Sequence, residues 1–301
     1  MEVREVAMKI LIASDGSAES AGVVQEAAAR PWPTESQFWL VTMLDPFFFT
    51  RAPLQLEEAK KKTMEGLEED AEVLKQAGWA VNPEVLVENP RRGIPRVASE
   101  WKADMILLGS HGRGAFSRLL LGSTAQAVLR HAACSVEVVR LGKREKRGAG
   151  EGMRVLIPTD GSAAANQAAQ SVAERPWPQG SEFKVIAGPE FPVLVGEYPF
   201  YSTEQLTQVE QHSEKHAAEA AANTIAILAK AGLRAASEVT EPKDTPTQAI
   251  LEAADAWGAD LIVLGSHGRR GFDRLVLGSV SESVALHAHC SVEVNRRNSA
   301  G

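Results

Sequence analysis

Cysteine is scarce in this chain: only Cys134 and Cys290 occur in 301 residues. Each stands at the start of an apolar segment, and the two segments have nearly the same sequence. Buried thiols at such positions behave as small apolar side chains. We therefore expect two structural cysteines rather than a redox pair.

The chain has no excess of positive charge. It carries 32 Lys and Arg against 39 Asp and Glu, a formal net charge of −7. Wide nucleic-acid interfaces rely on a basic surface. The single basic run, at 143–147, lies in a charged, Gly-rich segment that we interpret as a solvated tether. No DNA-reading motif is visible, so no nucleic-acid partner is expected.

Long apolar runs are also missing. None approaches the roughly 20 residues that a membrane-spanning helix needs, and no lipid-anchor motif is present. The apolar run near the N-terminus is short and ends in Asp15, with no cleavage-type segment after it. This pattern does not fit a secretory signal. We expect no membrane association and a cytoplasmic location.

Motifs for ATP hydrolysis and for metal binding are absent or incomplete. The phosphate loop Gly-x4-Gly-Lys-(Ser/Thr) does not occur, and no nucleophile stands beside a matching base. The run His287-Ala-His289-Cys290 has the spacing of metal ligands, but the other half has only His131 and Cys134 there. Zinc needs further ligands. We expect no metal ligated by side chains and no efficient catalysis.

What the chain does have is a long internal repeat. Residues 103–140 and 259–296 are identical at 24 of 38 positions. Shorter motifs repeat as well: Asp-Gly-Ser at 15–17 and 160–162, and Arg-Pro-Trp-Pro at 30–33 and 175–178. A period near 150 residues is the size of a domain. We divide the chain into domain 1 (1–141), a linker (142–152) and domain 2 (153–301).

Each domain alternates short apolar segments with helical patterns, which favours a parallel sheet with crossover helices. The expected strands are 9–14, 38–44, 80–87, 105–108 and 135–139, then 154–159, 183–187, 233–239, 261–264 and 291–295. The expected fold class is α/β, with two tandem doubly wound domains. Each domain has a five-stranded parallel sheet flanked by helices. Ligands of such sheets bind at the carboxyl ends of the strands, where the strand order reverses.

A glycine spacing follows the fourth strand of each domain. The first copy is Gly109-Ser-His-Gly112, nine residues, then Gly122-Ser123; the second is Gly265-Ser-His-Gly268, nine residues, then Gly278-Ser279. Such a loop lets the backbone approach a ligand closely and leads it to a helix N-terminus, which favours phosphate. The glycines alternatively form only a turn. Arg113 and Arg269, inside the loops, either pair with phosphate or are simply exposed.

Two further residue pairs stand near the same strand ends. Asp15 and Asp160 either accept hydrogen bonds from a ligand or serve only the Asp-Gly turn, and the sequence leaves both readings open. His111 and His267 lie within the loops, where they could contact a phosphate or a ribose. We do not expect them to act as general bases, because no acidic partner is visible beside them.

Together these residues resemble the universal stress protein family. Three features in each half carry the resemblance: a first strand ending in Asp-Gly-Ser, a fourth strand of the type Ala-Asp-(Met/Leu)-Ile-x-Leu, and the glycine loop. The resemblance covers nearly the whole chain as two tandem domains. It implies a fold like that of the adenine nucleotide α-hydrolases and binding of adenine nucleotides, usually ATP, often with a divalent ion such as Mg²⁺. It also implies a nucleotide-dependent regulator of stress survival rather than an efficient enzyme.

The resemblance assigns binding residues to both halves. In the first half these are Asp15, Met43, Leu108 and Gly109 around the adenosine, His111 and Gly112 along the phosphates, and Gly122, Ser123 and Thr124 holding them. In the second half they are Asp160, Leu264, Gly265, His267, Gly268, Gly278, Ser279 and Val280. Gly188 stands where the first half has Met43, so the apolar side chain that would cover the base is missing. The insertion that follows Gly188 either covers the base instead or blocks the site. We therefore expect the first site to bind more tightly.

Two alternatives remain open. One is a weak ATP-hydrolysing or autophosphorylating enzyme of the nucleotide α-hydrolase type, although such enzymes usually carry Ser-Gly-Gly-x-Asp-Ser where this chain has Ser14-Asp-Gly-Ser17. The other is a nucleotide-free interaction scaffold, against which two intact loops argue. Family members pair through their last strands, which implies an intramolecular pseudo-dimer here. A homodimer and an unidentified protein partner are further expectations.

Overall fold

The computed structural model describes residues 7–50, 53–111, 121–141, 151–189, 203–240, 245–269 and 277–296. Its ten strands form one sheet in the order β3-β2-β1-β4-β5-β10-β9-β6-β7-β8. The strands are β1 (Lys9–Ser14), β2 (Gln37–Leu44), β3 (Ala80–Val87), β4 (Met105–Gly109), β5 (Ser135–Val139), β6 (Arg154–Thr159), β7 (Glu182–Ala187), β8 (Ala235–Val239), β9 (Leu261–Gly265) and β10 (Ser291–Asn295).

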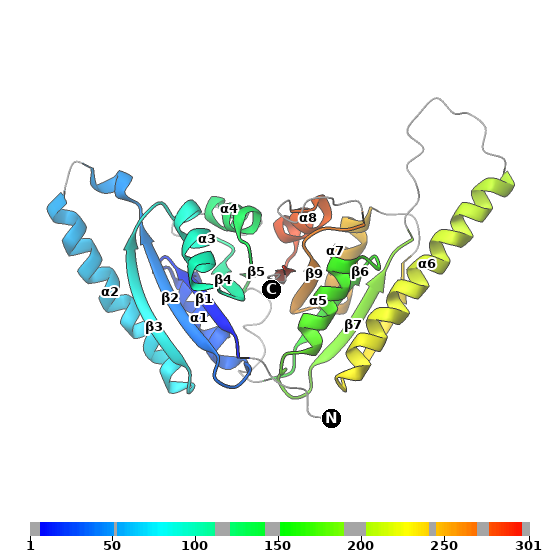
Figure 1. Ribbon diagram of the computed structural model, residues 1–301, viewed down its shortest axis with the longest axis horizontal. Helices are drawn as coiled ribbons and strands as arrows, with labels where there is room; N and C mark the ends of the chain where they lie inside the picture. The colour runs from blue at the N-terminus through cyan, green and yellow to red at the C-terminus, as the bar shows by residue number, and fades with distance from the viewer. Residues whose placement is uncertain are drawn as a thin grey trace.

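Helices connect successive strands within each half. They are α1 (Ala18–Ala29), α2 (Pro53–Gln76), α3 (Pro90–Trp101), α4 (Ser123–His131), α5 (Ala163–Ala173), α6 (Thr203–Lys230), α7 (Pro246–Trp257) and α8 (Ser279–His287), with a short 3-10 helix η1 (Pro46–Phe49). Figure 1 shows the two halves side by side, with α2 and α6 on the outer flanks. None of the described helices is long and apolar enough to cross a membrane.

Each half is the doubly wound parallel sheet that the sequence predicts. All neighbours within a half are parallel, and the order reverses between β1 and β4 in the first half and between β6 and β9 in the second. Buried strands here lack polar alternation; β4 and β9 read Met-Ile-Leu-Leu-Gly and Leu-Ile-Val-Leu-Gly. Parallel strands covered by helices on both faces need such continuous apolar runs. The fold prediction is confirmed.

Some element boundaries differ from those expected. The apolar pattern predicts the third helix over 94–102, whereas α3 begins four residues earlier, at Pro90. The side chain of Asn89 accepts from the backbone N–H of Arg91, and proline is well suited to the first helical position. Strand β8 begins at Ala235 rather than at 233. The polar cap at Asn89, rather than apolar periodicity, sets where α3 starts.

The hydrophobic core is shared unevenly between the two faces of the sheet. On the face covered by α3, α4, α7 and α8, one cluster of buried residues runs continuously through both halves. The opposite face has two separate clusters, one under α1 and α2 and one under α5 and α6. The halves are therefore joined through one core layer and are independent in the other.

The two halves meet along β5 and β10, which pair antiparallel with Glu137 opposite Glu293. Arg140 donates to the carbonyls of Ala285 at 2.6 Å and Cys290 at 3.4 Å, and the repeat-equivalent Arg296 donates to the carbonyl of Leu129 at 2.5 Å. Each arginine thus holds the last turn of a helix in the other half. This is the strand pairing expected for a pseudo-dimer within one chain. Burial lowers the pKa of both guanidinium groups.

A buried ion pair lies on each side of this seam. Arg30 binds both carboxylate oxygens of Glu137 at 2.6 and 2.8 Å, and Arg175 binds Glu293 at 2.8 Å. Both glutamate side chains are fully buried, and those of the arginines are 6% and 7% exposed. The Arg-Pro-Trp-Pro motif therefore supplies the counter-charge for a carboxylate that the sheet encloses.

The two cysteines are buried as expected, and Trp32 packs in the core of the first half. Trp32 contacts Phe38 edge-on at 5.9 Å, and its ring N–H donates to the carbonyl of Ala27. Cys134 and Cys290 are buried and form no disulfide. Both lie in the core layer that joins the halves.

We predict that neither cysteine reacts with an aromatic disulfide reagent at pH 8 while the protein is folded. Burial raises the pKa of the Cys134 thiol to about 12, so the reactive thiolate is scarce, and Cys290 is only 5% exposed. Reaction of two thiols should appear only in denaturant, as followed by absorbance. Rapid labelling of the native protein would contradict the burial of this layer.

Candidate functional site

The carboxyl ends of β1 and β4 lie next to each other in the first half. Ala13 pairs with Leu108, so the next residues, up to Asp15 and Ser110, leave the sheet side by side. In the second half β6 and β9 are neighbours in the same way; Asp160 follows β6, and Gly265 is the last residue of β9. The structure thus brings the Asp-Gly-Ser motif and the start of the glycine loop to the position where doubly wound sheets bind ligands.

The Asp-Gly-Ser motif forms the same turn in both halves. Asp15 Oδ1 accepts from the N–H of Ser17 at 3.0 Å, and Asp160 Oδ1 accepts from Ser162 at 2.9 Å. Gly16 has φ +71°, a left-handed conformation that glycine adopts without strain. The serine then caps the following helix. One carboxylate oxygen of each aspartate therefore serves the Asp-Gly turn, as the sequence suggested. Binding of a ligand by these aspartates stays a prediction.

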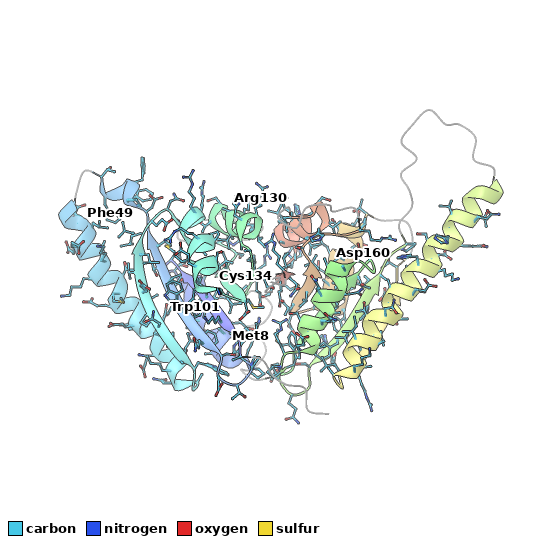
Figure 2. All side chains as sticks on the ribbon, in the orientation of Figure 1. Met8, Phe49, Trp101, Arg130, Cys134 and Asp160 are labelled. Atoms are coloured by element: carbon cyan, nitrogen blue, oxygen red, sulfur yellow. The ribbon has the colours of Figure 1, made fainter. Side chains whose placement is uncertain are left out.

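In the second half, the glycine loop folds back onto the aspartate. Asp160 Oδ2 accepts from the N–H of Arg269 at 3.1 Å, and a Cβ at Gly268 would lie 2.7 Å from the same oxygen. The guanidinium of Arg269 lies 3.3 Å from both ring nitrogens of His216 on α6. Figure 2 shows Asp160 at the upper end of the second half, near the carboxyl end of its sheet. A ligand that bound Asp160 would have to share its carboxylate with the backbone N–H of Arg269.

The helices after the two loops begin without a side-chain cap. α4 and α8 have Gly122 and Gly278 at the N-cap, and within the described residues neither helix start has a side-chain cap. By contrast, a serine, asparagine or threonine side chain caps each of α1, α3, α5 and α7. A Cβ at Gly122 would lie 3.2 Å from the carbonyl oxygen of Ser110, a contact tighter than most side chains make, so glycine suits this close approach. Ser123, Thr124, Ser279 and Val280 form the uncapped first turns.

Two of the residues assigned to the adenosine, Met43 and Leu108, lie on one face of the sheet. Met43 and Leu108 both pack with the core cluster under α3 and α4. Leu108 and Leu264 are 4% and 3% exposed, so they can offer a ligand only backbone atoms. In the second half, the Oγ1 of Thr240 would lie 2.8 Å from a Cβ at Gly188 and occupies the space that a larger side chain would need.

Two predicted positions, Gly112 and Arg113, lie outside the described residues. The same holds for most of the insertion after Gly188, at 190–202, which we considered as a cover for the second base. No group of three or more His, Cys, Asp or Glu side chains within the described ranges is arranged to hold a metal ion.

One expectation about His111 is wrong, because an acidic side chain does lie beside it. Glu19 Oε1 is 3.6 Å from His111 Nδ1 and accepts from the backbone N–H of His111 at 3.3 Å. Ser110 Oγ bridges them, donating to Glu19 at 2.6 Å and lying 2.8 Å from His111 Nδ1. Glu19 is in the first turn of α1, distant in sequence, so only the packing of α1 against β4 reveals the contact.

Comparison with known proteins identifies the family. The family model described as "Universal stress protein family" matches residues 7–140 and again 153–296. The chain belongs to the universal stress protein family. Both halves are therefore universal stress protein domains, in a family named for its role in the stress response.

Relatives match over the full length or over one half. A universal stress protein of Mycolicibacterium smegmatis is 27% identical over 297 residues, covering 95% of this chain and 96% of the relative. One from Methanocaldococcus jannaschii is 29% identical over 143 residues, covering 46% and 84%. A universal stress protein structure from Archaeoglobus fulgidus has a TM-score of 0.66 at 21% identity and covers 96% of this chain and 98% of that one. The similarity to the Archaeoglobus fulgidus structure supports the fold of this tandem universal stress protein.

The structure adds Arg91 to the candidate site, a residue that the sequence analysis did not single out. Arg91, in the first turn of α3, donates from Nη2 to Ser123 Oγ at 2.8 Å. With Asn89 and Arg92 it lines a surface groove of about 410 Å³. Its only sequence signal was two arginines directly after a proline that starts a helix. A guanidinium thus lies beside the uncapped start of α4.

The matching groove of the second universal stress protein domain has a different character. It measures about 460 Å³ and lies between α7 and α8, with Thr245, Thr247, Gln248 and Ser279 in its lining. Thr247 and Gln248 stand where the first half has Arg91 and Arg92. Glu252 and Asp255 complete the lining. The first groove is basic and the second is not.

Proposed function

We propose that this universal stress protein binds an adenine nucleotide, ATP in particular, at the carboxyl ends of β1 and β4 and of β6 and β9. The observation that carries the proposal is the pair of uncapped helix starts at Gly122 and Gly278. Free N–H groups at a helix start bind anions, and the helix dipole favours negative charge there. The capped helices of the same chain have no such vacancy.

The residues at the first helix start fit a phosphate group. Glycine at 122 leaves a close approach that a Cβ would fill, and Arg91 supplies positive charge next to Ser123. Arginine pairs with phosphate through charge-assisted hydrogen bonds. A divalent ion such as Mg²⁺, when bound with ATP, would neutralise part of the phosphate charge. We propose that it enters with the nucleotide, held by phosphate oxygens rather than by a cluster of protein ligands.

We propose that the first site binds more tightly than the second. Arg91 and Arg92 of the first groove are replaced by Thr247 and Gln248 in the second, which removes two positive charges. The loop N–H of Arg269 already engages Asp160, so binding there competes with a contact inside the protein. Met43 also offers an apolar side chain that Gly188 lacks.

We further propose that nucleotide occupancy regulates a protein partner and that the chain is not an efficient enzyme. The Ser110 hydroxyl lies within hydrogen-bond distance of Glu19 and His111, as an activated nucleophile would. Ser110 is only 3% exposed, however, so its hydroxyl is closed to a substrate. Because β5 and β10 pair, one chain would have the symmetry of a dimer of single domains. We also propose that two chains form a homodimer and that the protein is located in the cytoplasm.

The experiment is to measure nucleotide stoichiometry and then remove the sites singly. Nucleotide released from denatured protein is identified by chromatography, and ATP, ADP and cAMP are titrated by calorimetry. Gly122→Val and Gly278→Val place side chains 3.1–3.2 Å from the loop backbone. We expect each variant to weaken one site by on the order of tenfold or more, a change of about 1.4 kcal/mol per decade.

Gly66→Ala is the matched control, because a Cβ at Gly66 in α2 meets nothing within 4 Å. It should bind as the unmodified protein does. Thermal midpoints of all three variants show whether they fold. Equal affinity at both sites would contradict the ranking of the sites, and no adenine nucleotide binding at all would leave the scaffold reading.

A further inference from the structure

The end of β4 carries a chain of hydrogen bonds that differs between the two halves. In the first half, Glu19, Ser110 and His111 are connected through the Ser110 hydroxyl, at 2.6 Å to Glu19 and 2.8 Å to His111 Nδ1. In the second half, Ser266 Oγ lies 2.9 Å from His267 Nδ1. The residue that matches Glu19 there is Ala164, which has no polar side chain.

Counting protons assigns the histidine tautomers. A serine hydroxyl has one proton to donate, and at Ser110 that proton points to the Glu19 carboxylate, the stronger acceptor. The short contact between Ser110 Oγ and His111 Nδ1 then requires a hydrogen on Nδ1. No described carboxylate accepts from Ser266, so its proton goes to Nδ1 of His267 and the hydrogen of that ring lies on Nε2.

The other ring nitrogen of His111, Nε2, has no partner in the part of the chain that the structure describes. The His111 side chain is 8% exposed, and its buried Nε2 has no hydrogen-bond partner among the described residues. His111 lies against the start of α4, since a Cβ at Gly122 would be 3.6 Å from its Cα. A buried polar atom without a partner is costly and marks a place where a ligand atom can bind.

We propose that Glu19 makes the first site proton-coupled: His111 binds phosphate as an imidazolium, donating from Nε2, whereas His267 binds phosphate as a neutral ring. The proposal rests on the nucleotide site proposed above. With hydrogen already on Nδ1, Nε2 can donate to a phosphate oxygen only after taking up a proton. The Glu19 carboxylate stabilises the resulting charge and otherwise lies beside the phosphate as a repelling group.

The charged groups near this histidine come from several elements. Glu19 faces it from α1, and Arg140 at the end of β5 interacts with Glu19. Asp15 ends the neighbouring strand β1, and Arg91 of α3 bonds to Ser123 at the start of α4. Of these charged groups, only Glu19 is connected to His111 by described hydrogen bonds: through the Ser110 hydroxyl to the ring, and directly to the backbone N–H. It acts as a positioning residue rather than as a contact to the ligand.

The first test reads the tautomers without any nucleotide. Long-range proton–nitrogen NMR correlations of ¹⁵N-histidine-labelled protein at pH 8 should show His111 with hydrogen on Nδ1 and His267 with hydrogen on Nε2. Single His111→Gln and His267→Gln variants assign the signals. Glu19→Ala copies the natural Ala164 of the second half, and should convert His111 to the His267 pattern. The same tautomer at both histidines in the unmodified protein would overturn the proposal.

The second test measures proton uptake on ATP binding. Gly278→Val leaves the first site and Gly122→Val leaves the second, and each is titrated with ATP at pH 8 in buffers of different ionisation enthalpy. We expect uptake of about one proton per ATP at the first site, where hydrogen on Nδ1 leaves Nε2 without one, and about none at the second, where Nε2 already carries hydrogen. Glu19→Ala in the Gly278→Val background should abolish the uptake.

The two tests separate this inference from the proposed function. Absence of ATP binding would remove the function, while the tautomers would still confirm or refute the role of Glu19. ATP binding at the first site without proton uptake would overturn the inference and leave the function standing. Affinity at the first site should also fall as the pH rises, because binding there takes up a proton, and that of the second site should not.

Discussion

Arg30→Ala should lower the free energy of unfolding by about 3–5 kcal/mol, because it leaves a buried carboxylate without its counter-charge. Glu137 is fully buried in β5, directly opposite the equally buried Glu293 of β10. Arg30 binds both oxygens of Glu137 and also Glu26 at 2.8 Å. Without the guanidinium, two carboxylates would face each other in the seam. Urea denaturation followed by circular dichroism measures the loss.

The second half provides an internal comparison for this prediction. Arg175 makes one bond to Glu293, at 2.8 Å, and the other oxygen of Glu293 has no partner among the described residues. Arg175→Ala should therefore destabilise less than Arg30→Ala. The control is Arg96→Ala, which breaks ion pairs on the surface and should leave the midpoint nearly unchanged.

A double variant decides whether the charge or the packing matters. Replacing both partners, Arg30→Leu with Glu137→Leu, removes the unpaired charge and should recover most of the stability. A loss below about 1 kcal/mol for Arg30→Ala alone would show that water reaches Glu137, contrary to its burial. Because the chain has two domains, the comparison uses midpoints and slopes as well as extrapolated free energies.

Gly265→Ala should destabilise the protein by about 1–3 kcal/mol, whereas the equivalent Gly109→Ala should be close to neutral. A Cβ at Gly265 would lie 2.6–2.9 Å from three atoms of Ala164, two of them backbone, so α5 would have to move. A Cβ at Gly109 first meets Cγ of Glu19 at 3.2 Å, and that flexible side chain can turn away. Neither glycine has a positive φ, so alanine fits both backbones.

The measurement is the thermal midpoint of the two variants, compared with Gly66→Ala. Replacing glycine also stabilises the folded state by roughly 0.4–1 kcal/mol through the unfolded chain, which offsets the small contact at Gly109. Gly109→Ala should in addition loosen the Glu19–Ser110–His111 connection, visible in the His111 NMR signals. Equal destabilisation by the two substitutions would mean that the contacts of Ala164 and Glu19 do not differ as described.

The repeat and the strand pattern predicted the fold well, for a local reason. Continuous apolar runs such as 105–108 and 261–264 are buried on both faces of a parallel sheet, and that burial follows from the residues themselves. The same is true of the turn at Asp15-Gly-Ser, where glycine supplies the positive φ and serine the helix cap. Helix starts such as Pro90 were missed, since the cap precedes the apolar pattern.

The candidate site was only partly predictable. The glycine loop and Asp15 were found because their chemistry is written in short motifs. Arg91 and Glu19 were missed because they reach the site from helices that come before β4 in the chain, at separations of 32 and 91 residues from their partners. The Arg-Pro-Trp-Pro motif was visible as a repeat, but the sequence did not show that its arginine pairs with Glu137.

The sequence by itself determined two doubly wound domains, the strand ends that carry Asp15 and the glycine loop, and the membership of a family. These follow from residue types at fixed local spacings. Only the tertiary structure decided that Arg30 neutralises Glu137, that the halves share one core layer, and that Glu19 distinguishes His111 from His267. Such contacts join residues of opposite charge or complementary hydrogen bonding across the sheet, and their strength depends on burial, which the order of residues does not state.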